Sequence, residues 1–220
     1  MNDPYASLKD NSWRELAEID ARLEVGEIDE RGWHDAIAAI VVPAYLGAET
    51  PWGQSGKSGT DEDWEWSRSH VADAIDRDGS FLDVGCASGY LMECLPRWTA
   101  FEVEPFGLEI SPELAALART RLPRWDARVF VGNALDWEPP REFTYIRTGL
   151  EYVPAARRSE LVTSLLMSCE RLIVGVFNEH ESERTIESLL ESWGVEVAGR
   201  SVRPNRRKQG MEYRVVWIDS

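Results

Sequence analysis

Apolar residues in the first part of the chain recur every three or four positions, which is the spacing of amphipathic helices. One such pattern covers about residues 12–25, and a second begins near Glu30. Proline disfavours a helical backbone in the residue before it, so the second helix is expected to stop at Pro43. A glycine-rich loop, 46–59, precedes a third helical pattern from about Thr60 to Gly79. This part of the chain is therefore predicted to consist of helices joined by loops.

Beyond residue 80 the pattern changes to short apolar runs that alternate with helical patterns, which is typical of a parallel α/β sheet. The expected strands are 81–85, one that ends at 107–110, 128–131, 143–148, 172–177, 195–202 and 211–218. The expected helices are 113–121, one that begins at Pro154, and about 183–193. A polar loop joins the last two runs, so they are predicted to pair as an antiparallel hairpin.

The composition is that of an ordinary globular protein, with 220 residues and a hydrophobic content of 43%. The formal net charge of −15 argues against a nucleic-acid or anionic membrane partner, because both need a basic face. The three cysteines show no paired spacing, which favours a reduced, cytoplasmic setting. The N-terminus is unlike a signal peptide, and the longest apolar run (36–48) is too short to span a bilayer. We expect no metal site, because no His, Asp or Glu cluster has ligand spacing.

The candidate chemistry is concentrated in the stretch Phe81–Tyr90, an apolar strand that ends in a turn of small residues and leads into a helix. Such a turn lets a ligand approach the backbone, with the helix N-terminus directed at it. A dinucleotide requires the spacing GxGxxG, but Gly85, Ala87 and Gly89 place the third small residue one position early. A P-loop is disfavoured as well, since Pro51 stands where its first glycine is required.

The stretch Asp83–Gly89, with the sequence DVGCASG, is similar to the acidic-x-Gly-x-Gly-x-Gly signature of class I S-adenosylmethionine-dependent methyltransferases. The chain resembles this family from about residue 60 to 220, and it departs from the signature at Ala87, where a glycine is usual. The resemblance implies an α/β fold: a Rossmann-like, seven-stranded, mostly parallel sheet with an antiparallel C-terminal hairpin, plus an N-terminal helical lid. It also implies two parts, the N-terminal helices with a glycine-rich lid loop (1–60) and the methyltransferase core (61–220).

The resemblance further implies S-adenosylmethionine as the cofactor. Glu109 ends the second strand 20 residues beyond Gly89, and a carboxylate there can accept hydrogen bonds from both ribose hydroxyls. After the third strand, Asn133 and Ala134 match the position of the family's adenine contacts. The expected cofactor-binding residues are Asp83, Gly85, Cys86, Ala87, Gly89, Glu109, Ile110, Asn133 and Ala134.

The methyl acceptor is expected between the N-terminal lid and the loops that follow strands 143–148 and 172–177. Glu151 and His180 are the candidate catalytic residues, as general bases, although a base is needed only where the acceptor must lose a proton. The alternative for each is a helix-cap, ion-pair or core role. The expected substrate-binding residues are Tyr45, Trp52, Gln54, Ser55 and Tyr152. Alternatively, the loop that carries Trp52 only joins the lid to the sheet.

These features together predict the transfer of a methyl group from S-adenosylmethionine to a nitrogen or oxygen nucleophile of a small-molecule acceptor, by in-line displacement. The expected partner is therefore a small molecule, and neither a nucleic acid nor a membrane. The pattern leaves the oligomeric state open. Three alternatives also stay open: a non-catalytic S-adenosylmethionine-binding protein, a protein methyltransferase and an NAD-dependent oxidoreductase.

Overall fold

The computed structural model describes residues 15–180 and 185–220, with the backbone alone at 176–180. The described part forms a seven-stranded sheet in the order β3-β2-β1-β4-β5-β7-β6. The strands are β1 Gly79–Val84, β2 Val103–Glu109, β3 Val129–Val131, β4 Phe143–Thr148, β5 Cys169–His180, β6 Gly199–Pro204 and β7 Met211–Asp219. The first five pair in parallel, whereas β7 is antiparallel to both β5 and β6. The predicted sheet and its C-terminal hairpin are thus confirmed.

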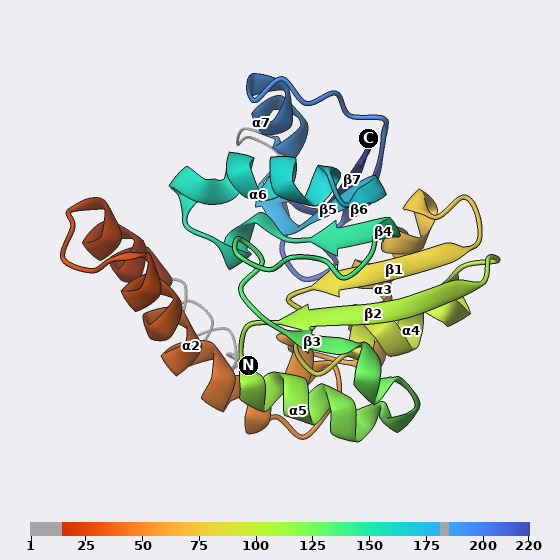
Figure 1. Ribbon diagram of the computed structural model, residues 1–220, viewed down its shortest axis with the longest axis horizontal. Coiled ribbons are helices and arrows are strands. Elements are labelled where there is room, and N and C mark those ends of the chain that lie inside the picture. Colours follow the sequence, from red (N-terminus) through yellow and green to blue (C-terminus); the bar gives the residue numbers. More distant parts are fainter. Residues whose placement is uncertain (1–14, 181–184) are drawn as a thin grey trace.

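Helices cover both faces of the sheet (Figure 1). The α-helices are α2 Glu30–Leu46, α3 Asp61–Arg68, α4 Tyr90–Trp98, α5 Pro112–Arg121, α6 Arg158–Leu166 and α7 Ile186–Ser192. The 3-10 helices are η1 Gly53–Ser55, η2 Ser69–Ala74, η3 Pro123–Arg128, η4 Leu150–Tyr152 and η5 Ala155–Arg157. Successive residues of β1 face opposite sides: Leu82 and Val84 pack with α6 and α7, whereas Phe81 packs with α3 and α4. Each face of the sheet therefore has its own apolar core.

Local sequence signals account for the helix starts. Thr60 caps α3, because its side chain accepts from the N–H of Asp63 while the Asp63 carboxylate accepts from the N–H of Thr60. Ser111 caps α5 by accepting from the N–H of Leu114, and Pro112 occupies the first helical position. Ser111 follows the end of β2 directly, so this cap also sets the path of the chain beside Glu109.

Two helices differ from their predicted lengths. α2 does not stop at Pro43 but continues to Leu46. A proline in the last turn removes only one intrahelical hydrogen bond, and the N–H of Gly47 still bonds the Pro43 carbonyl at 2.9 Å. The helix predicted from Thr60 to Gly79 gives way to η2 after Arg68, because Gly79 already pairs with Val103 in the sheet and the chain must extend before it.

The remaining differences concern element ends. β5 is longer at both ends than the predicted 172–177, because Cys169 already pairs with β4 and His180 still pairs with β7. Residues 15–24 are helical, as predicted, and the expected start of that helix near residue 12 lies outside the described residues. The start predicted near 183 for α7 lies outside them too. Within the described ranges, none of the helices has the length and apolar character needed to cross a membrane.

Candidate active site

A cavity of about 880 Å³ lies at the carboxyl ends of β1, β2 and β4. In Figure 1 the arrowheads of these strands point towards α2, which lies across this end of the molecule. One wall of the cavity is the apolar face of α2, with Ile37, Val41 and Tyr45, and the other is formed by the strand ends and their loops. This is the edge at which ligands bind in open α/β sheets.

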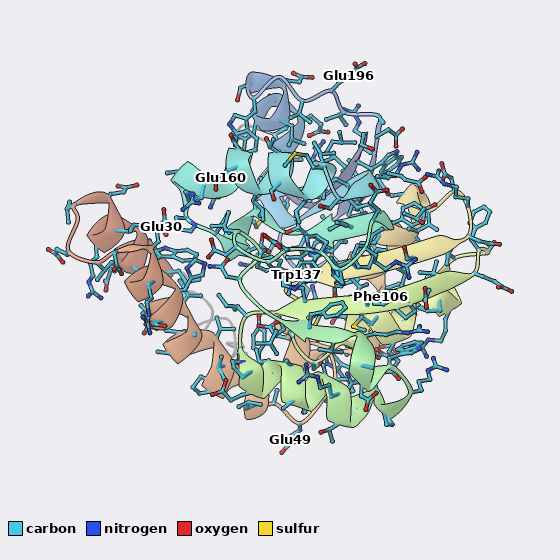
Figure 2. All side chains as sticks on the ribbon, viewed as in Figure 1. Glu30, Glu49, Phe106, Trp137, Glu160 and Glu196 are labelled. Atoms are coloured by element: carbon cyan, nitrogen blue, oxygen red, sulfur yellow. The ribbon has the colours of Figure 1, made fainter. Side chains whose placement is uncertain are left out.

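Both ends of α2 are attached to the rest of the molecule. Near its N-terminal end, Arg157 forms ion pairs with Glu30 of α2 and with Glu160 of α6, two glutamates labelled in Figure 2. Beyond its C-terminal end, the loop 47–59 returns to the sheet, where the hydroxyls of Ser55 and Ser88 are 2.8 Å apart. The cavity lies beneath a helix that is held at both ends.

The small-residue turn after β1 has three residues in the left-handed region of backbone space. Their φ angles are 73° at Gly85, 47° at Ala87 and 73° at Gly89. A Cβ on Gly85 would lie 2.7 Å from the ring of Tyr152, so glycine is what lets that ring pack against the backbone of the turn. Ala87 adopts this conformation with a Cβ, at a cost of roughly 1–2 kcal/mol. The alanine that departs from the family signature thus keeps the backbone path of the turn.

Glu109 holds this turn from the end of β2. One carboxylate oxygen accepts from the N–H of Ala87 at 2.8 Å, and the other accepts from the N–H of Ser111 at 3.0 Å. The side chain is buried, and burial raises the pKa of Glu109 while the two backbone N–H groups oppose that shift. Because a carboxylate offers about four lone-pair sites, its oxygens can accept further hydrogen bonds from hydroxyls in the cavity.

Asp83, Arg147 and Tyr152 form a buried polar group at the centre of the site. Asp83 and Arg147 are register partners on β1 and β4, and their side chains are 3.2 Å apart with 3% and 5% exposed. The same guanidinium nitrogen donates to the Tyr152 hydroxyl at 3.0 Å. Burial raises the pKa of Asp83, and the charge of Arg147 opposes the shift. Arg147 thus fixes the position of the Asp83 carboxylate and of the Tyr152 hydroxyl.

The other predicted cofactor residues divide into two groups. Cys86, Ile110, Asn133 and Ala134 line the cavity. Burial, followed by the charges of nearby carboxylates, raises the pKa of the Cys86 thiol, which keeps it uncharged. Gly89 does not line the cavity; it begins α4 as the N-cap residue, and its role in cofactor binding stays a prediction.

The two candidate bases are placed differently. Glu151 lies on η4 and lines the cavity, with its carboxylate folded back so closely that a Cβ on Gly149 would overlap it. His180 is the last residue of β5, paired with Met211, and its side chain lies outside the part of the chain that the structure describes. Of the two, Glu151 is the one that the structure brings to the cavity.

The predicted substrate residues are also split. Tyr45, Ser55 and Tyr152 line the cavity. Trp52 does not: its indole donates to the carbonyl of Gly59 at 2.9 Å and packs against the ring of Tyr90. The Gln54 amide is also outside the lining and donates to the Ala48 carbonyl at 3.1 Å. These contacts fasten the loop to itself and to the sheet, and substrate binding by Trp52 and Gln54 stays a prediction.

The sequence interpretation did not select Arg68 and Arg147, and both line the cavity. A signal for Arg147 was present, since it is a charged residue inside the apolar run 143–148. A charge is almost never buried in a strand without a partner. Arg68 ends α3 between two serines, and nothing in the local pattern separates it from a surface arginine.

Among the described residues, no group of three or more His, Cys, Asp or Glu side chains could hold a metal ion.

No family model matches the sequence, and no curated protein matches it either. Comparison with solved structures is informative. Magnesium protoporphyrin IX methyltransferase from Synechocystis PCC 6803, with S-adenosylmethionine bound, matches with a TM-score of 0.60 at 15% identity. The match covers 88% of this chain and 98% of that one.

A second match is 1,6-didemethyltoxoflavin-N1-methyltransferase from Burkholderia thailandensis, with its substrate and S-adenosylhomocysteine bound. Its TM-score is 0.63 at 16% identity, over 88% of this chain and 91% of that one. The chain has the class I methyltransferase fold. The predicted resemblance is thereby confirmed for the fold, and at these identities for the fold alone.

The same methyltransferase fold also occurs in a protein named for another reaction. The cyclase SpnF matches with a TM-score of 0.58 at 15% identity, over 87% of this chain and 94% of that one. Function must therefore be argued from the residues of the site and not from the fold.

Proposed function

We propose that this protein is an enzyme that transfers a methyl group from S-adenosylmethionine to a small-molecule acceptor. The observation that carries the proposal is the placement of Glu109 beside the left-handed turn at Gly85 and Ala87. There the backbone that lines the cavity and a buried carboxylate meet at the carboxyl ends of the strands. The cavity of about 880 Å³ has room for a nucleoside together with an acceptor.

The residues present suit each part of the cofactor. Gly85 keeps the turn free of a Cβ, which would overlap the ring of Tyr152 at the edge of the cavity. Glu109 would accept from the ribose hydroxyls, and Asn133 with Ala134 would border the adenine. When bound, S-adenosylmethionine supplies an electrophilic methyl group on a sulfonium, which a nucleophile displaces in line. The protein's task is then to orient the nucleophile and exclude water.

The acceptor side is assigned to α2 and to the loop after β4. Burial, then the charge of Glu151, raises the pKa of Tyr45 to about 12, and burial also raises the pKa of Tyr152. Both phenols therefore stay protonated near neutral pH, so they would donate hydrogen bonds and would not act as bases. Glu151 is the group in the cavity that would take a proton from an acceptor that carries one. The N-terminal part, 1–60, would act as the lid over this space.

Calorimetry tests the proposal directly. We expect S-adenosylhomocysteine to bind and NAD not to bind. Glu109→Gln should weaken S-adenosylhomocysteine about 10- to 100-fold, because a hydrogen bond to a charged acceptor contributes about 1.5–3 kcal/mol. Glu104→Gln, on the same strand but at the opposite edge, is the matched control and should leave the affinity unchanged.

Turnover separates an enzyme from a silent binder. A library of small nucleophiles is incubated with S-adenosylmethionine, and release of S-adenosylhomocysteine is measured. Tight binding with no release from any acceptor would favour the non-catalytic alternative or a reaction of another kind on this fold. Binding of NAD in place of S-adenosylhomocysteine would overturn the proposal.

A further inference from the structure

His34 lies on the face of α2 that lines the cavity, together with Trp33 and Ile37. Its Nδ1 atom is 2.8 Å from the carbonyl oxygen of Glu30, one turn earlier in the same helix. A carbonyl oxygen only accepts hydrogen bonds, so Nδ1 carries the hydrogen and donates. In the neutral imidazole the other nitrogen, Nε2, then holds a lone pair and acts as an acceptor. The helix backbone thus fixes the tautomer of His34.

The Nε2 atom of His34 lacks a donor. The residue is half-buried, but Nε2 itself is buried, and none of the described residues forms a hydrogen bond with it. The ring is held by an edge-on contact with the indole of Trp33, with ring centroids 4.9 Å apart. Buried polar atoms are nearly always hydrogen-bonded, because an unpaired one loses its interaction with water and gains nothing in return.

The cavity is the side from which a donor can reach this atom. Nδ1 is directed back towards the backbone of α2, and Nε2 lies across the ring from it and points away from the helix. Because Nε2 is buried, the solvent outside the molecule does not supply the hydrogen bond. His34 belongs to the wall of the cavity, so a ligand there is placed to donate to Nε2.

Asp20 and Arg158 also line the cavity, and both have protein partners. Asp20 accepts from the indole of Trp33 at 2.7 Å. The Nε atom of Arg158 donates to the carbonyl of Leu150 at 3.0 Å. Both side chains are thus engaged with other groups, and His34 keeps an acceptor available to a ligand.

His34 lies far from the expected position of the cofactor. An α-helix rises about 1.5 Å per residue, so His34 is about 16 Å along α2 from Tyr45. The loop that follows Tyr45 touches the turn after β1, where the hydroxyls of Ser55 and Ser88 are 2.8 Å apart. Between its two ends, α2 lines the cavity with apolar side chains, among them Ile37, Ala38 and Val41.

We propose that His34 is a specificity-determining residue, and that the methyl acceptor is an apolar molecule with an N–H or O–H group at the end remote from the cofactor. That group donates to Nε2 of His34, while the apolar body packs along Ile37 and Val41. The inference rests on the proposed function for the word acceptor. The donor-binding site on His34 does not depend on it.

The test compares 2-naphthol, which donates from its hydroxyl, with 2-methylnaphthalene, which has nearly the same shape and no donor. Both are titrated into the protein saturated with S-adenosylhomocysteine, and the ratio of their affinities is measured in each variant. His34→Asn should lower the preference for naphthol about ten-fold relative to the wild-type protein, because the hydroxyl is then left unpaired in the cavity. Equal ratios in the two proteins, or no binding of naphthol to the wild-type protein, would overturn the proposal.

Two further variants separate ligand binding from a structural role. The amide of Asn reaches only the position of Nδ1, so His34→Asn keeps the contact with Glu30, whereas the amide of Gln reaches the position of Nε2. His34→Gln should therefore keep part of the preference for naphthol. If Gln loses the preference and Asn keeps it, the role of His34 is structural and the proposal is wrong. Asp35→Asn is the matched control, because Asp35 is the next residue, is exposed and pairs with Arg31 at 4.0 Å. It should leave the ratio unchanged.

A measurement on the wild-type protein needs no variant to fold. NMR spectra of nitrogen-labelled histidine distinguish the two neutral tautomers of the ring. We expect the Nδ1-protonated tautomer for one ring, and its Nε2 signal should shift when 2-naphthol is added. The signal belongs to His34 if it is missing from the spectrum of His34→Gln. An Nε2-protonated neutral ring at His34 would overturn the proposal.

The outcomes separate this inference from the proposed function. If S-adenosylhomocysteine does not bind the wild-type protein, the proposed function fails, and naphthol and methylnaphthalene are compared on the protein alone. A lower ratio in His34→Asn then supports the donor-binding site, and equal ratios overturn it. If S-adenosylmethionine is turned over with an acceptor, His34→Asn should raise KM for that acceptor and leave kcat nearly unchanged, because the bond is made equally before and during transfer. An unchanged KM would overturn the acceptor assignment.

Discussion

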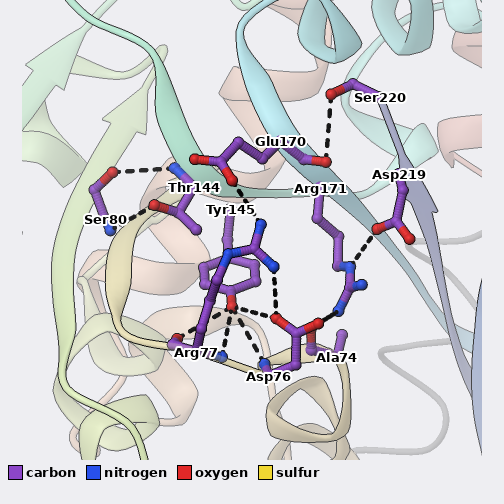
Figure 3. A network of polar contacts seen from close by, with 10 residues as sticks. All are labelled: Ala74, Asp76, Arg77, Ser80, Thr144, Tyr145, Glu170, Arg171, Asp219 and Ser220. Atoms are coloured by element: carbon purple, nitrogen blue, oxygen red, sulfur yellow. Dashed lines mark hydrogen bonds and ion pairs between the residues drawn. The ribbon is translucent and has the colours of Figure 1, made fainter.

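Two polar groups that each contain Tyr, Asp and Arg side chains lie at opposite ends of β4. At the amino end, the Tyr145 hydroxyl is 2.9 Å from Asp76, and Arg171 pairs with Asp76 and with Asp219 (Figure 3). At the carboxyl end, Arg147 contacts Asp83 and the Tyr152 hydroxyl beside the cavity. We call these the amino-end and carboxyl-end groups.

The amino-end group is saturated by protein partners. The Tyr145 hydroxyl accepts from the N–H groups of Asp76 and Arg77, and Arg171 also donates to the Ala74 carbonyl. Arg77 in turn pairs with Glu170 at 2.6 Å. Figure 3 shows that these contacts form one network between the end of η2 and the start of β5. Such a network connects segments of the chain and leaves few groups to receive a ligand.

The carboxyl-end group differs in burial and in its effect on the aspartate. Burial alone would raise the pKa of Asp76, but the Tyr145 hydroxyl and the charges of Arg171 and Arg77 lower it. For Asp83, burial prevails over the attraction of Arg147, and the pKa is raised. The same three residue types thus stabilise the charged aspartate Asp76 at the amino end, whereas at the carboxyl end burial disfavours the charged form of Asp83. Groups held in this way are typical of functional sites.

The largest expected difference is in stability. Arg147→Met should lower the free energy of unfolding by roughly 3–5 kcal/mol, because it leaves Asp83 buried without a partner. Arg171→Met should cost about 1 kcal/mol, because Asp76 and Asp219 are about half exposed and water can replace the cation. Urea denaturation measures both. The double variant Asp83→Asn/Arg147→Met should recover part of the loss, and equal costs for the two single variants would contradict the comparison.

A smaller effect on stability is expected from the protonation of His70, which lies in η2. His70 is fully buried, and burial followed by the charge of Arg203 lowers its pKa from 6.5 to about 4. The unfolded chain then binds the proton more tightly, so stability is complete above pH 6.5 and is lost as the pH falls towards 4. The loss should reach about 3 kcal/mol at pH 4.

Unfolding free energies from pH 7 to pH 4 measure this effect, with His70→Leu as the comparison. The leucine variant should lose about 3 kcal/mol less over that range than the wild-type protein. If the two proteins lose stability in parallel, the neutral buried histidine is not the cause.

The smallest expected effect is on the pH dependence of stability, where Asp76 and Asp83 should contribute with opposite signs. The contribution of Asp76 to stability is present above about pH 4 and is lost as the pH falls through its lowered pKa. For Asp83 the sign is opposite, because a raised pKa makes the folded state bind the proton more tightly. Relative to Asp83→Asn, the wild-type protein should gain stability as the pH falls towards 4; relative to Asp76→Asn, it should lose stability below pH 4. The same slope for both would remove the distinction between the groups.

The positions of the strands along the chain and of the turn after the first strand could be predicted because they depend on local patterns. Alternating apolar runs predicted the strands, and the small residues at 85–89 predicted a turn, in which the structure gives Gly85, Ala87 and Gly89 positive φ angles. The errors occurred where a distant contact overrides local preference. Pro43 does not end α2, and η2 replaces the last turns of the third helix because β1 must begin at Gly79.

The candidate site divides along the same line. The place of Glu109 at the end of an apolar strand is enough to identify it as a candidate site residue. A turn rich in small residues can likewise be recognised from its composition. An indole in a glycine-rich loop needs a partner, and Trp52 finds one in Gly59 and Tyr90 instead of in the cavity. Composition indicates that a partner exists, and only packing decides which one.

What the sequence by itself determined is the sheet, the turn after β1 and the carboxylate after β2, because each depends on residues close together in the chain. Only the tertiary structure decided that Arg68, Arg147, Tyr45 and Tyr152 line the same cavity. These residues come from three separate segments, and their approach follows from strand register and from the packing of α2 and α3. The pattern of charges along the chain carries no information about the distances between these side chains. Those distances are set by the core that holds the helices and strands together.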